Sequence, residues 1–139
     1  MEITAGAIIL RLTLTLVLGA AIGIQREKAQ TPAGLRTHML VTLGSGVFTL
    51  VSFLITDPNG MVDITRISAG IVTGIGFLGA GTILRHKDHI RGLSTAASVW
   101  TAAAIGMAVG YGLYLIACVA TVLTLVVLFM DGIERKFFK

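Results

Sequence analysis

Long apolar segments dominate this sequence, and the charged residues are confined to short stretches between them. Three segments contain no Asp, Glu, Lys or Arg: residues 37–56, 67–84 and 93–130. A fourth segment, residues 3–24, contains a single charge, Arg11. Because a helix needs about 20 apolar residues to cross the hydrocarbon core of a membrane, this pattern predicts transmembrane helices.

The longest segment must contain a turn. A single helix from residue 93 to residue 130 would be nearly twice as long as the hydrocarbon core is thick. Gly110, Tyr111 and Gly112 lie in its middle, where glycine permits turn geometry and tyrosine suits the membrane interface. We therefore predict an all-α membrane bundle of five spans in one domain, residues 1–139. The predicted spans are about 3–24, 37–56, 67–84, 93–109 and 113–130, with a short cytoplasmic tail at 131–139.

The composition agrees with a membrane bundle. The chain has 139 residues, of which 55% are hydrophobic and 13% charged, and its mean hydropathy is +0.89. An ordinary soluble domain is about a quarter charged, so a water-soluble domain is excluded. A cleaved signal peptide is the alternative interpretation of residues 3–24. Glu2 stands where a signal peptide carries positive charge, and Arg11 interrupts its apolar part, so we expect a retained helix.

The net charge of +4 is explained by the orientation of the chain in the membrane. All of the 11 Lys and Arg residues except Arg11 and Arg66 lie on one side of the predicted bundle. Cationic loops stay in the cytoplasm, which places the N-terminus outside and the C-terminus inside. This distribution explains the basic excess without a nucleic-acid partner.

Small residues recur at helical spacing in several spans. They include Gly19 and Gly23 in the first span and Gly106 in the fourth. The third span is the richest, with Gly70, Gly74, Gly76, Gly79 and Gly81. Small residues let helices approach closely in lipid, so we expect these glycines to pack helices together, with the third span at the centre and the glycine-free last span outside. A local unwinding of the third span that exposes carbonyls to an ion is the alternative.

Polar residues gather at the cytoplasmic ends of the predicted helices. Glu27 is the only acid in its loop, and an ion pair with Arg36 or Arg91 would tie the first span to the second or fourth. His38 lies in the same cluster. Ser94 and Thr95 are interpreted as an N-cap of the fourth helix. A solvated cationic rim is the alternative for most of this cluster.

The outer side carries fewer charges. Arg11 either extends to the outer surface or pairs with Glu2, Asp57 or Asp63. Asp63 stands three residues before Arg66 and is expected to cap the third helix. Asp57 and Asp63 together are the weak candidates for a Mg²⁺ site, because Mg²⁺ prefers oxygen ligands.

No catalytic constellation is present in the sequence, so we expect neither enzymatic activity nor a required cofactor, with Mg²⁺ left open as a ligand. Four segments resemble the membrane domain of the MgtC/SapB family: GAAIGIQRE at 19–27, AGLRTH at 33–38, RISAGIVTGIGFLGAG at 66–81 and RGLSTAASVW at 91–100.

This resemblance implies a multi-pass protein of the bacterial inner membrane. The founding virulence protein of that family is linked to growth at low magnesium and to survival in macrophages, and it restrains the proton-translocating ATP synthase. The resemblance implies functional roles for Glu27, Arg36, His38, Arg66, the glycines of residues 74–81, and residues 91–95. Ser94 replaces an asparagine of the virulence protein, and the soluble C-terminal domain of longer members is not expected here.

Two functions follow as alternatives. The first is a regulator that binds membrane proteins, such as ATP synthase, through its helix faces. The second is a small oligomeric transporter or channel for Mg²⁺ or H⁺. We expect contact with the lipid bilayer and a homodimer in either case.

Overall fold

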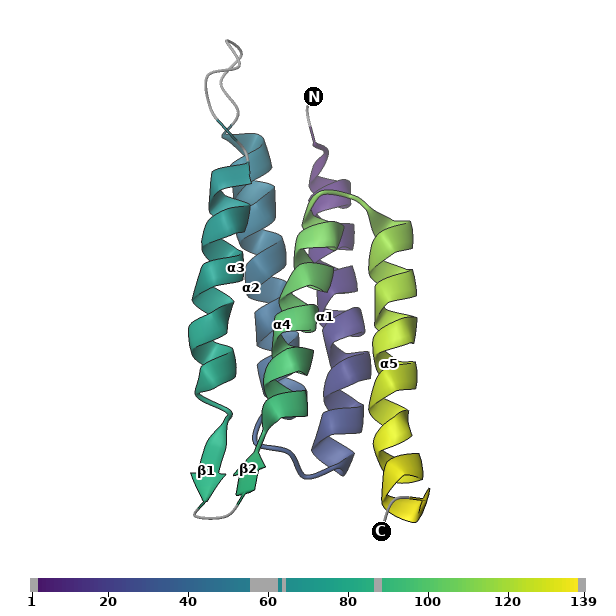
Figure 1. Ribbon diagram of the computed structural model, residues 1–139. Helices are drawn as coiled ribbons and strands as arrows, with labels where there is room; N and C mark the ends of the chain where they lie inside the picture. Colours follow the sequence, from purple (N-terminus) through teal and green to yellow (C-terminus); the bar gives the residue numbers. More distant parts are fainter. Residues whose placement is uncertain (1–2, 56–62, 64, 87–88, 138–139) are drawn as a thin grey trace.

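The computed structural model describes residues 3–55, 63, 65–86 and 89–137, with the backbone alone for residues 86, 89 and 131–137. Its helices run alternately up and down, side by side, with a small hairpin at one end (Figure 1). In chain order the elements are α1 (Ala5–Lys28), α2 (Leu35–Leu54), α3 (Thr65–Ala80), β1 (Leu84–His86), β2 (His89–Arg91), α4 (Leu93–Gly110) and α5 (Tyr114–Phe137).

The prediction of a helical bundle is confirmed for the described residues, which also contain one two-stranded hairpin. Three helices, α1, α2 and α4, are long and apolar enough to cross a membrane. The helix α3 and the Tyr114–Met130 part of α5 are shorter apolar helices. The chain is thus a membrane protein, while five complete spans and their orientation stay predictions.

The ends of three helices differ from the predicted spans by four residues or more. The first helix continues to Lys28, past the predicted end at residue 24. The third helix ends at Ala80, and the antiparallel strands β1 and β2 follow it, pairing Leu84 with Arg91. The last helix continues to Phe137, past the predicted end at residue 130. Hydropathy indicates which residues are apolar enough for the membrane and does not fix where a helix begins or ends. A helix can therefore end before the apolar segment does or continue beyond it. The turn after α4 lies where it was predicted, with Gly112 at φ +82°.

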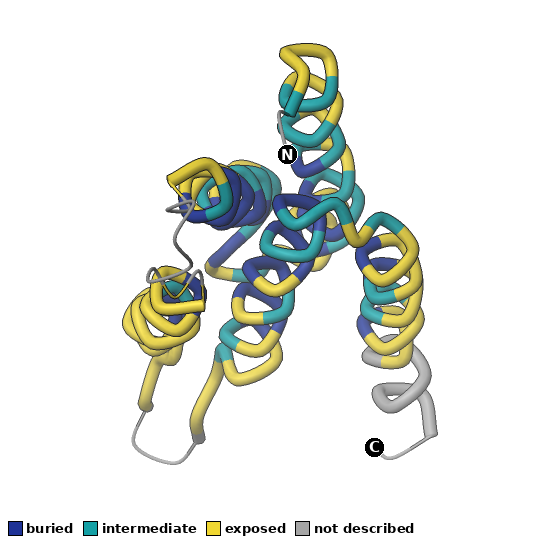
Figure 2. Tube along the Cα trace, turned by 90° about the horizontal axis from the view of Figure 1, so that it is seen from above, coloured by how far each residue is buried: buried dark blue, intermediate teal, exposed yellow. Residues whose placement is uncertain are grey.

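The centre of the bundle is α4, which packs against α1, α2, α3 and α5. The prediction that the third span is central is wrong. Of the α3 side chains, only Ser68, Ile75 and Gly79 are buried, and Figure 2 shows this helix almost entirely exposed beside the buried faces of α2 and α4. Glycine content alone does not distinguish contacts inside one chain from contacts with another molecule, which is why the sequence misplaced this helix.

Glycine brings α1, α2 and α4 into backbone contact. A Cβ atom at Gly19 would lie 2.9 Å from the His38 carbonyl oxygen, and one at Gly23 would lie 2.7 Å from the Leu35 Cα. A Cβ at Gly106 would lie 2.9 Å from the Thr42 Cα. No side chain fits at these distances, so the three helices can pack this closely only with glycine there.

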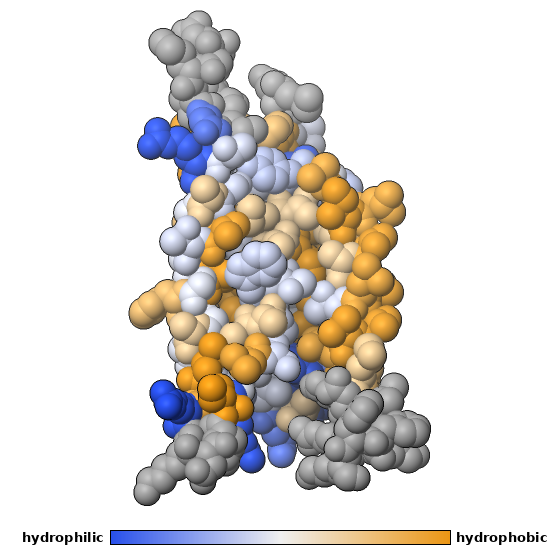
Figure 3. Space-filling view, in the orientation of Figure 1, coloured by the Kyte–Doolittle hydropathy of each residue, from blue (hydrophilic) through white to orange (hydrophobic). Residues whose placement is uncertain are grey.

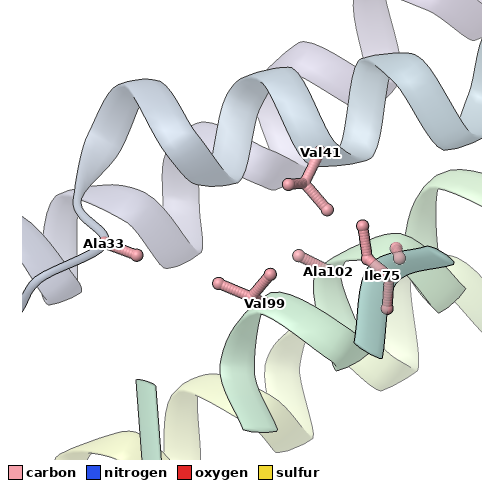
Figure 4. Packing of buried hydrophobic residues seen from close by; sticks show 6 residues of the cluster. Ala33, Val41, Ile75, Val99 and Ala102 are labelled. Atoms are coloured by element: carbon pink, nitrogen blue, oxygen red, sulfur yellow. The ribbon is translucent and has the colours of Figure 1, made fainter. Parts of the chain in front are cut away.

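Two apolar clusters complete the interior. In the first, side chains from α2, α3, α4 and the loop after α1 converge, as Figure 4 shows for Ala33, Val41, Ile75, Val99 and Ala102. The second joins α1, α4 and α5 through Ile22, Ile105, Val109, Ala117 and Leu128. Thus α4 contributes to both clusters and holds the bundle together.

Candidate functional site

A seam of buried polar side chains runs along α2 where it faces α1 and α4. Its members recur every three or four residues, and none is more than 4% exposed: His38, Thr42, Ser45, Thr49 and Ser52. The helical spacing of these residues was present in the sequence as a polar stripe within an apolar segment. That stripe was the available signal for a buried polar face, and sequence reasoning took only His38 from it.

Hydroxyl groups along this seam bond to their own helices. The Thr42 Oγ1 donates to the His38 carbonyl at 3.0 Å, and the Thr49 Oγ1 donates to the Ser45 carbonyl at 2.8 Å. On α1, the Thr15 Oγ1 donates to the Leu12 carbonyl at 2.7 Å. A hydroxyl satisfied within its helix can be buried at little cost, so these residues act as small packing groups.

His38 connects the N-terminal parts of α2 and α4. Its side chain is fully buried. The ring Nδ1 lies 2.9 Å from the Gly34 carbonyl, and because a carbonyl only accepts, Nδ1 carries a proton. The Nε2 lies 3.0 Å from the Ser98 Oγ, and that hydroxyl lies 2.8 Å from the Thr95 carbonyl. The structure therefore brings together two residues singled out from the sequence, His38 and Thr95, through Ser98, which sequence reasoning missed.

Sequence reasoning placed Arg26 only in the cationic cluster at this end and did not single it out as a site residue. It is 1% exposed, and its Nε donates to the Gln25 Oε1 at 2.6 Å. Its carbonyl accepts from the Thr31 amide and from the Thr31 hydroxyl at 3.0 Å. A cation near the C-terminal end of a helix interacts favourably with the helix dipole, so the guanidinium and the folded-back loop both stabilise the end of α1.

Glu27 caps α2. Its Oε2 accepts from the Leu35 amide at 2.9 Å, and the N-cap residue Gly34 has no side chain to do so. Among the described residues, Glu27 makes no ion pair with Arg36 or Arg91, contrary to expectation. The short loop between the helices brings the carboxylate to the first amide of α2, where an anion is favoured.

The other residues predicted at this end are on the surface. Arg36, Arg91 and Ser94 are exposed, while Thr95 is buried. The predicted N-cap at Ser94 and Thr95 is wrong, because α4 begins at Leu93 and its N-cap is Gly92. With φ at +92°, this position requires glycine, and its carbonyl accepts the Ala96 amide at 2.8 Å.

At the opposite end of the bundle, Arg11 bonds within the protein. Its Nη1 donates to the Gly110 carbonyl at 2.8 Å, and its Nε donates to the Tyr114 hydroxyl at 3.2 Å. The alternative of an internal partner is therefore the observed one, at the C-terminal end of α4 where a cation is favoured. Of the acids proposed as partners, Glu2 and Asp57 lie outside the described residues.

Asp63 lies just before α3 and satisfies its first turn. The Oδ1 accepts from the Thr65 hydroxyl at 2.6 Å and from the Thr65 amide at 2.9 Å. These two bonds, with a smaller contribution from the charge of Arg66, lower the pKa of the Asp63 carboxyl below its usual value. The Asp63 carbonyl accepts the Arg66 amide at 3.2 Å. The second residue of the candidate Mg²⁺ pair, Asp57, lies outside the described residues.

The glycines proposed for packing differ in their surroundings. Gly19, Gly23 and Gly106 lie against neighbouring helices. A Cβ at Gly79 would make ordinary contacts with Ala96, the closest at 3.5 Å, whereas one at Gly81 would meet only carbonyls of its own preceding turn. Positions 70, 74 and 76 face open space, because a Cβ atom added there would have no neighbouring atom within 4 Å.

The amino-acid sequence was also compared with known proteins. The model of the MgtC family matches residues 12–136. A putative magnesium transporter from Escherichia coli K12, YhiD, is 45% identical over 126 residues, which cover 86% of this chain and 58% of the relative. Protein MgtC from Salmonella typhimurium LT2 is 47% identical over 117 residues, which cover 84% of this chain and 49% of the relative.

An uncharacterized protein of Synechocystis is 44% identical over 118 residues, which cover 85% of this chain and 49% of the relative. The chain spans about half the length of these curated relatives, from 49% to 58%. No solved structure gives a significant match. With a family model that covers nearly the whole sequence and relatives of this similarity, the chain belongs to the MgtC family.

Proposed function

We propose that this chain is a non-enzymatic regulator of the bacterial inner membrane that acts by contact of its helices with other membrane proteins. The observation that carries the proposal is the open face of α3. The small residues Ala69, Thr73, Gly76 and Ala80 recur along one side of this helix and are all exposed. Small residues let a second helix approach closely in lipid, so this face suits a partner helix.

The chain's own packing supports the same conclusion. The glycines of α1 and α4 named above are covered by neighbouring helices, whereas Gly70, Gly74 and Gly76 have no such neighbour within 4 Å of a Cβ position. Keeping exposed glycine in a helix costs up to about 1 kcal/mol per residue relative to alanine. Several such positions in one helix favour a function for its surface outside this bundle.

The buried polar groups favour regulation over ion transport by a single chain. Among the residues whose side chains are described, no Asp or Glu is buried, while Arg26 is 1% exposed. A path for Mg²⁺ needs oxygen ligands and a negative potential. The seam along α2 instead consists of two threonines whose hydroxyls bond within their helix, two serines and one histidine.

The surface supports a multi-pass orientation. Strongly hydrophobic side chains gather over α5 in Figure 3, the middle of this face is apolar to near neutral, and strongly hydrophilic ones lie toward the two ends. Arg36, Arg85 and Arg91 lie at the hairpin end, which we place in the cytoplasm by the positive-inside rule. The N-terminus is then outside and the C-terminus inside.

Capture of partners from native membranes tests the regulator. The affinity-tagged protein is cross-linked in membranes, and the retained polytopic proteins are quantified, with the proton-translocating ATP synthase as the first target. We expect Gly76→Leu to abolish specific capture by filling the open face. The control Gly6→Leu, at another glycine with open space around it, should leave capture unchanged. Equal capture by both variants would contradict the proposal.

A Mg²⁺ transporter formed by several copies is the second candidate, because one relative is named a putative magnesium transporter. Purified protein in liposomes is assayed for flux of Mg²⁺, H⁺ and K⁺. Saturable flux that Glu27→Gln or Gly76→Leu abolishes would favour transport. Liposomes without flux, together with a captured membrane partner, would favour the regulator.

A further inference from the structure

An open groove of about 730 Å³ runs between α2 and α3. Its walls are apolar side chains and glycines from both helices, and large members such as Leu40 and Phe48 are exposed. Of the described lining residues only Arg36, Thr37 and Ser45 are polar, and Ser45 is 3% exposed. The groove is thus a long apolar surface whose accessible polar groups lie together at one end.

The polar end of the groove is cationic. Arg36 is exposed in the first turn of α2, and its guanidinium has no hydrogen-bond or ion-pair partner among the described residues. The amides and the dipole of a helix N-terminus also favour an anion. Glu27 binds the first amide of α2 from the side of α1, whereas the groove opens on the side of α3. An anion at the mouth of the groove would therefore meet Arg36 and Thr37.

The length of the groove fits one leaflet of a membrane. Along α2 it extends from Arg36 to Phe48, which is about 18 Å at 1.5 Å per residue. The hydrocarbon core of a bilayer is about 30 Å thick, so the acyl chains of one leaflet extend about 15 Å. A lipid acyl chain whose head group lies at Arg36 can therefore follow the apolar walls of the groove over its whole length.

We propose that this groove binds one phospholipid with a negatively charged head group, with an acyl chain between α2 and α3 and the phosphate at Arg36. Gly44 and Gly74 line the groove, and a Cβ atom added at either glycine would have no neighbouring atom within 4 Å. This open space leaves room for the acyl chain. Charge complementarity favours a lipid over a second apolar helix, because such a helix would leave Arg36 without an anion. The groove adjoins the regulatory face: Gly70 and Gly74 line the groove, whereas the face residues Ala69, Thr73, Gly76 and Ala80 do not.

Native mass spectrometry of the purified protein tests the head-group requirement. The protein is mixed with equal amounts of phosphatidylglycerol and phosphatidylcholine, and we expect one phosphatidylglycerol per chain with about a tenfold preference, the factor of one charge-assisted contact. Arg36→Gln should remove this preference. The control Arg91→Gln removes the same charge from an exposed residue at the same end and should keep it. Equal retention of the two lipids by the wild type would overturn the proposal.

Filling the groove tests the acyl-chain site. We expect Gly44→Leu to lower retention of phosphatidylglycerol about tenfold, because the leucine would displace part of the acyl chain from the apolar walls, whereas Gly76→Leu should retain it. Circular dichroism verifies that both variants are helical. Unchanged lipid binding by Gly44→Leu would overturn the proposal. If this variant also lost a dimer that the wild type forms, a second copy of the chain would be the occupant of the groove. Binding of soluble glycerol phosphate without a chain would overturn it as well.

Discussion

Glycine serves opposite purposes in two regions of this protein. Where α1, α2 and α4 meet, Gly19, Gly23 and Gly106 bring backbones so close that a Cβ atom would lie 3.0 Å or less from its neighbours. In α3, Gly70 and Gly76 face open space. The same residue type therefore stabilises the bundle in one region and leaves a surface uncovered in the other. The difference teaches that a glycine-rich helix is not by itself a central helix.

The largest expected effect separates these two regions directly. Gly106→Ala places a Cβ 2.9 Å from the Thr42 Cα, backbone against backbone, and should lower the free energy of unfolding by about 3 kcal/mol. Gly76→Ala should raise it by up to about 1 kcal/mol, because alanine favours a helix and nothing lies within 4 Å. Thermal unfolding of the purified variants in one detergent measures both. Equal destabilisation would show that α3 is covered in the same way as α4.

A smaller effect tests the polar side of the packed region. Ser98→Ala removes the hydroxyl that lies 3.0 Å from the His38 Nε2 and leaves a buried ring nitrogen without this partner. We expect the free energy of unfolding to fall by about 2 kcal/mol, the cost of an unsatisfied buried group. The control Ser94→Ala changes an exposed serine on the same helix and should have almost no effect. A denaturant titration that gives similar values for the two variants would contradict the role assigned to Ser98.

Loss of the cap of α2 should lower the free energy of unfolding less than either of these changes. Glu27→Ala removes the acceptor of the Leu35 amide and should cost about 1 kcal/mol, as other lost helix caps do. Hydrogen exchange of the first turn of α2 should accelerate more than that of α4. Arg91→Gln serves as the control, because that side chain is exposed at the same end. A uniform acceleration in both helices would mean that Glu27 acts on the whole bundle.

Much of the fold could be predicted from where charges are absent. The lipid-compatible lengths and the turn at Gly110–Gly112 follow from local composition, which acts within one element. The hairpin of Leu84 with Arg91 and the central place of α4 depend on contacts between distant segments, which no local pattern contains. The same distinction explains why the cap by Asp63 was predicted, whereas the contact of His38 with Ser98, 60 residues apart, was not.

The smallest effect concerns the start of α3, the exposed region of the comparison. Because bonds from Thr65 lower the pKa of the Asp63 carboxyl in the folded protein, this carboxylate stabilises the first turn most fully above its ordinary pKa. That contribution decreases as the pH falls below about 4 toward the lower pKa of the folded state. Amide exchange, corrected for its intrinsic pH dependence, should show loss of protection in the first turn of α3 at low pH, while the middle of α4 stays protected. In Asp63→Asn, which has no carboxyl to titrate, this local change should disappear. Its persistence in that variant would assign the pH response to another group, and the open face of α3 would then be positioned independently of its cap.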